Sequence, residues 1–141
     1  MPADTLVIVS DAHIESKPTD IDAALHAFLD AVPTLGDALL INGDLFHFWF
    51  AYRRAIPRHA FPIAAHVAAV ARCVPVMIVG GNHDRWGDAF WSEQRGVMFS
   101  PRELRFAVAG RRGLALHGDG LNRGWGPRRL RLSRRPPRRR K

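Results

Sequence analysis

The sequence contains few of the features that mark secreted or membrane-spanning proteins. It has a single cysteine, Cys73, so a disulfide within the chain and a cysteine-based metal site are both excluded. The apolar runs Leu6–Val9 and Val74–Val79 fall far short of the roughly 20 residues that a membrane-spanning helix requires. A secretion signal has a basic stretch followed by a long apolar segment, and the N-terminus has neither. We therefore expect a cytoplasmic protein, and peripheral contact with the inner membrane stays open.

Acidic residues are missing from the last part of the chain, and this absence explains the basic composition. The formal net charge is +8, but residues 123–141 hold ten of the 21 Lys and Arg residues and no Asp or Glu. Residues 1–122 are left with 11 basic and 13 acidic residues, a net charge of −2. We predict a folded core over residues 1–122 and a disordered Arg- and Pro-rich tail over residues 123–141. The tail could bind anionic lipid, but we expect no nucleic-acid partner.

The core alternates short apolar segments with amphipathic ones. Apolar segments predicted as buried parallel strands cover residues 5–10, 38–42 and 74–79. A helix that starts with the capping box Thr19 and Asp22 is expected to run to about Ala31, and further helices are expected over 61–72 and 88–95. Two later strands, 104–108 and 113–116, are expected to flank a turn at 110–113. This order predicts an α/β fold with a parallel sheet covered on both faces.

Polar motifs directly follow four of the predicted strands. They are Asp11-x-His13, Gly43-Asp44, Gly81-Asn82-His83-Asp84 and His117-Gly118-Asp119. Because ligands bind at the carboxyl ends of parallel strands, these side chains are expected to gather at one edge of the sheet. Gly43 and Gly81 would let the backbone turn sharply there. Oxygen and imidazole donors in this mixture suit manganese, zinc or iron(II), and a pair of such ions can activate water and clamp a phosphoryl group.

Taken together, the motifs resemble the calcineurin-like metallophosphoesterases, whose pattern is D-x-H, GD, GNH followed by D or E, a lone His, and GH-x-H. The resemblance covers about residues 6–122. It implies a metallophosphoesterase-type β-sandwich flanked by helices, and a hydrolase that uses two divalent metal ions, manganese first and zinc or iron(II) as alternatives. Asp11 and His13 correspond to ligands of the first metal, and Asp44 to the bridge between the metals. Asn82 and His117 correspond to ligands of the second metal.

The resemblance also implies a catalytic role for the third motif. His83 corresponds to the residue that stabilises the phosphate or protonates the leaving group, and Asp84 is expected to orient it by accepting a hydrogen bond from its ring. The phrases GDLF, GNHD and LHGD, with aromatic residues nearby, are similar to the UDP-2,3-diacylglucosamine pyrophosphatase branch of lipid A synthesis. This similarity implies a nucleotide-lipid or another small phosphoester as substrate, although members of that branch commonly have Arg where His83 stands.

One element of the family pattern is absent, because no histidine follows His117 and the GH-x-H pair is therefore missing. The resemblance then implies that each metal lacks one ligand and that the C-terminal part of the sandwich is incomplete. The switch to arginine and proline looks like a truncated or frame-shifted reading of a longer gene. The alternative to an enzyme is a non-catalytic remnant that binds metal weakly and associates through its basic tail. The sequence does not indicate an oligomeric state.

The remaining histidines and aromatic residues have plainer interpretations. His26, His59 and His66 are expected at surface or boundary positions. His47 could approach a substrate phosphate or pack against its aromatic neighbours, and we leave it outside the predicted ligand set. A further group could line an acyl or nucleobase pocket, although packing in a lid or core is favoured: Phe46, Phe48, Trp49, Phe50, Tyr52, Trp86 and Trp91.

Overall fold

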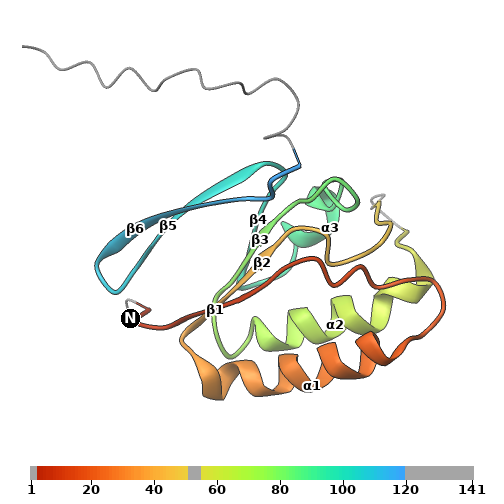
Figure 1. Cartoon of the computed structure of the whole chain (residues 1–141), viewed down its shortest axis with the longest axis horizontal. Coiled ribbons are helices and arrows are strands. Elements are labelled where there is room, and N and C mark those ends of the chain that lie inside the picture. The colour runs from red at the N-terminus through yellow and green to blue at the C-terminus, as the bar shows by residue number, and fades with distance from the viewer. Residues whose placement is uncertain (1–2, 51–54, 120–141) are drawn as a thin grey trace, which may run out of the picture.

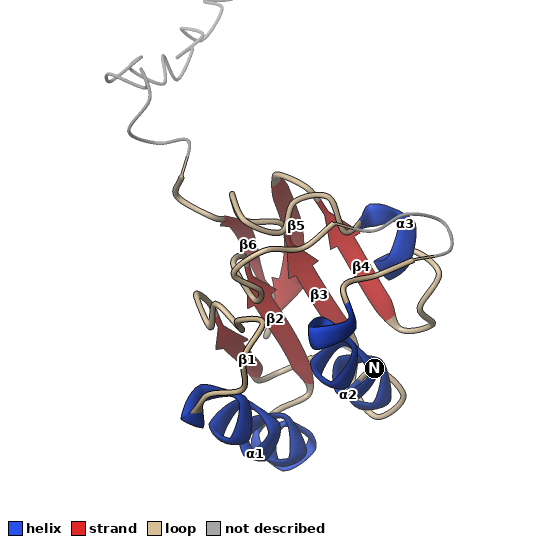
Figure 2. Ribbon diagram, turned by 90° about the vertical axis from the view of Figure 1, so that its right-hand side faces the viewer, coloured by secondary structure: helices blue, strands red, loops and turns tan. Residues whose placement is uncertain are grey.

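A computed structural model describes residues 3–50 and 55–119 of the chain. Four parallel strands form its main sheet in the order β1-β2-β3-β4 (Figure 2). Their bounds are Leu6–Val9, Ala38–Asn42, Val76–Val79 and Val97–Ser100. The register pairs Ile8 with Leu40, Leu40 with Met77 and Met77 with Met98. The predicted α/β class with a parallel sheet is confirmed.

Helices cover one face of this sheet, where α1 (Asp20–Leu35) and α2 (Phe61–Val70) lie side by side (Figure 1). The predicted capping box is present, because Thr19 accepts from the Ile21 amide while Asp22 accepts from the Thr19 amide. The helix α1 continues beyond the predicted end at Ala31, through Pro33 to Leu35. It does so because Val32 is fully buried against the sheet layer and its carbonyl still accepts from Gly36.

A hairpin of β5 (Glu103–Val108) and β6 (Arg111–Leu116) covers the opposite face, as Figure 1 shows. Leu104 and Ala115 of the hairpin form a small apolar cluster with Leu40 and Val79 of the sheet. The predicted turn over residues 110–113 is wrong, because only Ala109 and Gly110 connect the paired strands. Both have positive φ, of 48° and 73°, as a two-residue hairpin loop that matches strand twist requires.

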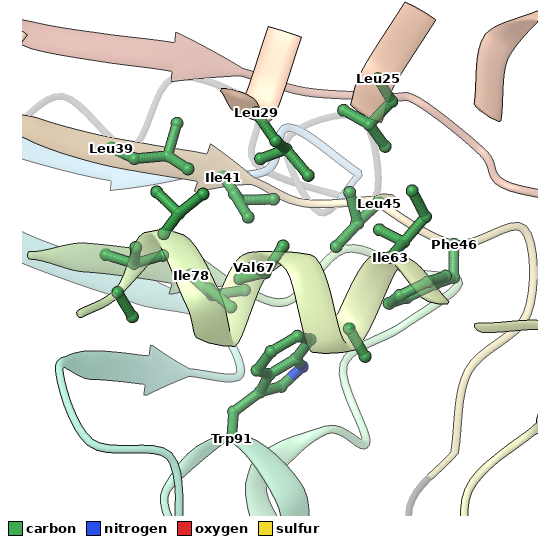
Figure 3. Packing of buried hydrophobic residues seen from close by; sticks show 14 of the residues in the cluster. Leu25, Leu29, Leu39, Ile41, Leu45, Phe46, Ile63, Val67, Ile78 and Trp91 are labelled. Carbon is green, nitrogen blue, oxygen red and sulfur yellow. The ribbon is translucent and has the colours of Figure 1, made fainter. Parts of the chain in front are cut away.

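The main core lies between the helices and the sheet (Figure 3). Leu29 of α1, Val67 of α2 and Ile41 of β2 are all fully buried there. The predicted inward positions of the second helix, Ile63, Val67 and Val70, are confirmed. Burial of such apolar surface contributes about 25 cal/mol per Å², which makes this layer the main source of stability.

The shorter elements depart from the sequence expectations. Strand β3 starts at Val76 rather than Val74, and α3 (Asp88–Trp91) ends before the predicted Arg95. Strand β4 is a further element that the sequence does not predict. The short 3-10 helix η1 (Arg58–Ala60) precedes α2. In the described residues no helix combines the length and the apolar character needed to cross a bilayer, and the predicted tail 123–141 lies outside them.

Candidate metal centre

The loops that follow β1 and β2 run side by side and bring the first two motifs together. The Asp11 amide donates to the Gly43 carbonyl at 3.0 Å, and the His13 amide donates to the Asp44 carbonyl at 2.9 Å. These two backbone hydrogen bonds extend the parallel pairing of the strands beyond their carboxyl ends. The side chains of Asp11, His13 and Asp44 consequently face a common space.

Both loops have an unusual backbone. Asp11, His13 and Asp44 have φ values of 58°, 49° and 51°, and Gly43 has a φ of 85°. A residue other than glycine held in the left-handed region costs about 1–3 kcal/mol. Hydrogen bonds between the loops, and those that Asp44 accepts, offset this strain energy. Strain of this kind collects at functional sites, and all three non-glycine residues are ones that the motifs single out.

Asp44 lies at the centre of the group and is almost completely buried. Its Oδ1 accepts from the His83 amide at 3.0 Å. Its Oδ2 lies 3.6 Å from His13 Nε2 and 3.2 Å from His117 Nε2. Asp11 Oδ1 lies 3.9 Å from His13 Nε2 and 4.0 Å from His117 Nε2. Two carboxylates and two imidazoles thus point their donor atoms at one centre.

His117 reaches this centre from the end of β6. Its Nδ1 lies 3.0 Å from the Asn42 carbonyl, so Nδ1 carries a proton, while Nε2 faces the carboxylates of Asp44 and Asp11. The ring packs over Gly43, where a Cβ atom would overlap it. Burial lowers the pKa of His117, but the Asn42 carbonyl and the charges of Asp44, Asp11 and Asp119 together outweigh it, and the net pKa is raised.

Asp84 has a role different from the predicted one. Its buried carboxylate accepts four backbone N–H groups at 2.7–3.3 Å, those of Gly81, Asp44, Leu45 and Phe46. Burial raises the pKa of Asp84, while these four hydrogen bonds act in the opposite direction. The expectation that Asp84 accepts from the His83 ring is wrong, because His83 Nδ1 pairs with the His47 carbonyl at 2.6 Å. Asp84 instead fastens the loop after β2 to the loop after β3.

Gly81 is needed for space rather than for a special backbone angle. A Cβ atom there would overlap Asp44 Oδ1, so only glycine allows the two loops to approach this closely. The expectation that Gly43 permits a sharp turn is confirmed by its positive φ, whereas Gly81 is not among the glycines with positive φ. The close approach places the His83 amide against the Asp44 carboxylate.

The other residues of the third motif lie at the margin of the group. The His83 ring stands edge-on to the His13 ring, with centroids 5.0 Å apart. Asn82 is exposed, and within the described part of the chain its side chain forms no hydrogen bond with the carboxylates. His47 lies outside the predicted ligand set, yet its exposed ring lies 5.1 Å from that of His83. Its position three residues after Asp44 is the sequence signal that points to it.

The donor set fits a divalent cation. One ligand atom each from Asp11, His13 and Asp44 lie within 4.8 Å of one another. His117 adds a second imidazole whose far nitrogen is held by a carbonyl, the arrangement that metal-binding histidines usually have. Mixed carboxylate and imidazole donors suit manganese, zinc and iron(II).

The aromatic residues near the site divide into two groups. Phe46 and Trp49 are fully buried and stacked at 4.7 Å, and Trp91 packs beside Trp49, so these three belong to the core. Phe48 and Trp86, in contrast, are 54% and 55% exposed. Packing in the core, one of the two favoured interpretations, therefore holds for the first group. Tyr52, which the same prediction included, lies outside the described residues.

Comparison with known proteins agrees with the geometry. The sequence profile of the family described as Calcineurin-like phosphoesterase matches residues 5–134. The UDP-2,3-diacylglucosamine hydrolase of Klebsiella pneumoniae subsp. pneumoniae is 31% identical over 115 residues, 82% of this chain and 48% of that protein. The protein of the same name from Porphyromonas gingivalis is 27% identical over 119 residues, 81% of this chain and 45% of its own. This chain thus spans about half the length of the curated relatives that it matches.

A solved structure supports the fold. The phosphoesterase Yfce from E. coli superposes with a TM-score of 0.52 at 21% sequence identity, over 81% of this chain and 57% of that chain. At this identity the likeness concerns the arrangement of strands and helices alone.

Proposed function

Because the chain belongs to the calcineurin-like phosphoesterase family, we propose that it hydrolyses a phosphoester or pyrophosphate bond at the centre around Asp44. The observation that carries the proposal is the convergence of His13 Nε2 and His117 Nε2 on one buried oxygen of Asp44, at 3.6 and 3.2 Å. A buried carboxylate oxygen that faces two imidazole nitrogens is suited to bind metal ions together with them.

Each candidate ligand has a role in this proposal. Asp11, His13 and Asp44 would hold one divalent ion, and Asp44, Asn82 and His117 would hold the other. When bound, such ions lower the pKa of water and neutralise charge on the phosphoryl oxygens. Manganese is our first choice, and zinc or iron(II) are the alternatives. For Asn82 the proposal rests on its place in the motif.

His83 would act on the leaving group. Its Nδ1 is engaged by the His47 carbonyl at 2.6 Å, which orients the ring and leaves Nε2 free to donate a proton when the imidazole is charged. Its amide also donates to Asp44 at 3.0 Å, which joins His83 and the bridging carboxylate in one hydrogen-bonded unit. Asp84 supports this unit through the backbone amides of the two loops rather than through the His83 ring.

For the substrate, we propose a nucleotide-linked lipid. The support is the 31% identity to a protein named UDP-2,3-diacylglucosamine hydrolase. The exposed Phe48 and Trp86 offer apolar surface close in sequence to His47 and His83, where acyl chains could pack. A lipid substrate also favours a cytoplasmic protein that works at the surface of the inner membrane.

Replacement of Asp44 by Asn tests the proposed reaction. With manganese and a chromogenic phosphodiester, we expect turnover by Asp44→Asn to fall more than about 100-fold, because loss of an outer-shell partner alone costs about 10- to 100-fold. The matched control is Asp20→Asn, which alters an exposed carboxylate in the first turn of α1 and should retain full activity.

Metal content separates the enzyme from a non-catalytic remnant. The proposal predicts about two equivalents of manganese together with turnover. Less than one equivalent without turnover would support the remnant, and an Asp44→Asn protein as active as its parent would exclude Asp44 as the bridge.

A further inference from the structure

Three imidazoles form a cluster of their own beside the carboxylates. The rings of His13, His47 and His83 have centroid separations of 5.0 Å for His13 with His83, 5.1 Å for His47 with His83 and 5.9 Å for His13 with His47. One ring nitrogen of each lies within 4.8 Å of the other two. The motifs do not group these three residues, because His47 lies outside all four motifs.

Backbone hydrogen bonds hold the three histidines in place. The His47 amide donates to the Ile14 carbonyl at 3.0 Å, directly after His13 in the chain, and the Trp49 amide donates to the His83 carbonyl at 3.1 Å. The pairing of His83 Nδ1 with the His47 carbonyl ties the remaining two together. The cluster is therefore part of the loop framework rather than a chance meeting of mobile side chains.

The nitrogen atoms of the cluster are available to a ligand. His83 commits Nδ1 to a carbonyl, so its Nε2 keeps a lone pair when the ring is neutral. His13 Nδ1 is buried and has no hydrogen-bond partner among the described residues, an arrangement that calls for an explanation. The His47 ring is exposed, so an ion can enter from solvent.

Ligand chemistry distinguishes this cluster from the neighbouring carboxylate group. Three neutral imidazoles suit zinc, which is commonly held by three histidines and an open position. Manganese and magnesium prefer carboxylate and water oxygens, which Asp11 and Asp44 supply. The histidine cluster and the carboxylate group share His13. Cations of different kinds can therefore bind on either side of this residue.

We propose that His13, His47 and His83 form a zinc-selective site next to the carboxylate group. Zinc bound there would take up the nitrogen of His83 that the proposed reaction needs, so the site would inhibit hydrolysis. The inhibition rests on the proposed function, whereas the binding itself does not. His47 is the residue specific to this site, since it has no place in the carboxylate group.

Calorimetric titration of the full chain with zinc and, separately, with manganese tests the inference. In His47→Ala we expect the zinc dissociation constant to rise at least about tenfold and the manganese constant to change less than about twofold. His59→Ala, which removes a histidine of η1 outside both groups, is the matched control and should leave both constants unchanged. Zinc should also shift the ring resonances of His47 in imidazole NMR spectra of the parent.

Equal zinc affinity in His47→Ala and the parent, or a His47 ring that zinc does not shift, would overturn the site. Thermal melting of the variants checks that each is folded, and exposed His47 is not expected to affect it. If the unmutated protein binds zinc through His47 but hydrolyses no phosphodiester, the zinc site is supported and the proposed hydrolase activity is contradicted.

Discussion

The apolar side chains between the helices and the sheet and two carboxylates in the loops at the carboxyl end of the sheet are both buried, but by different means. In the layer, fully buried Leu29, Val67 and Ile41 interlock without polar groups. In the loops, the carboxylates of Asp44 and Asp84 are 3% and 6% exposed and are surrounded by hydrogen-bond donors. The stability of the layer depends on the volume and shape of its side chains, whereas the structure of the loops depends on particular hydrogen-bonding atoms.

The two regions also differ in backbone conformation. Helix α1 and strand β2 are regular, but Asp11, His13 and Asp44 all have positive φ. The apolar layer provides the stability that offsets this strain. The strained backbone of the loops, in turn, directs their side chains toward a common centre. Substitutions that separate stability from metal binding are therefore the most direct way to test the contrast.

Asp84→Asn should have the largest effect on stability. An amide oxygen can replace some of the four interactions, but its NH2 group would face backbone donors, and each buried donor left unpaired costs about 1–3 kcal/mol. We expect a loss of about 4 kcal/mol in the free energy of unfolding, together with weaker manganese binding, because Asp84 joins the two loops. Urea unfolding and metal titration measure the two effects.

Asp37→Asn is the control for this substitution. Asp37 also accepts two backbone amides, those of Asp4 and Thr5 at 3.0 and 2.9 Å, but it is exposed. Water can replace a lost partner there, so we expect a loss below about 1 kcal/mol. Equal losses in the two variants would contradict the view that the buried position of Asp84 sets its importance.

Leu29→Ala should have the next largest effect on the free energy of unfolding, but unlike Asp84→Asn it should not weaken manganese binding. Removal of a fully buried leucine from α1 leaves a cavity, and we expect a loss of about 3 kcal/mol in the free energy of unfolding. The manganese affinity of the folded protein should not change, because the loops contain none of the deleted atoms. Urea unfolding and calorimetry at a temperature where the variant is folded measure both quantities.

The matched control lies in the same helix. Leu35 is 54% exposed, so Leu35→Ala should cost less than about 0.5 kcal/mol. A change in manganese affinity in Leu29→Ala, with no loss of folded protein, would show that the layer and the loops are coupled more closely than their contacts indicate.

The same contrast explains which features could be predicted from the sequence. Strand β2 has the predicted bounds Ala38–Asn42, and the start of α1 follows its capping box, because periodicity and local hydrogen bonding determine both. Strand β4 has only four residues and lies at the edge of the sheet, and none of the four polar motifs follows it, so the local sequence carries little signal for it. Helix α1 runs past the predicted end at Ala31 because the burial of Val32 outweighs the local effect of Pro33.

In the site, the motifs predicted which residues come together but not every contact between them. Asp11, His13, Asp44 and His117 share one centre, as their places after the strands suggested. The partner of Asp84 could not be read from its neighbour His83, because the loop turns the carboxylate inward toward amides contributed largely by the loop after β2. Sequence adjacency does not specify the direction of a side chain in an irregular loop.

The smallest expected effect is a pH dependence that arises at His117. Its pKa is raised in the folded protein, so in the absence of metal it contributes stability that is fully present below its ordinary pKa of about 6.5 and is lost as the pH rises through the raised value. The melting temperature of the metal-free parent, relative to His117→Asn, should therefore fall as the pH rises across that window. Saturating manganese should reverse this slope, because a metal ligand must be deprotonated. If the slope had the same sign with and without manganese, His117 would not bind the metal, and the loops would owe their order to the hydrogen bonds alone.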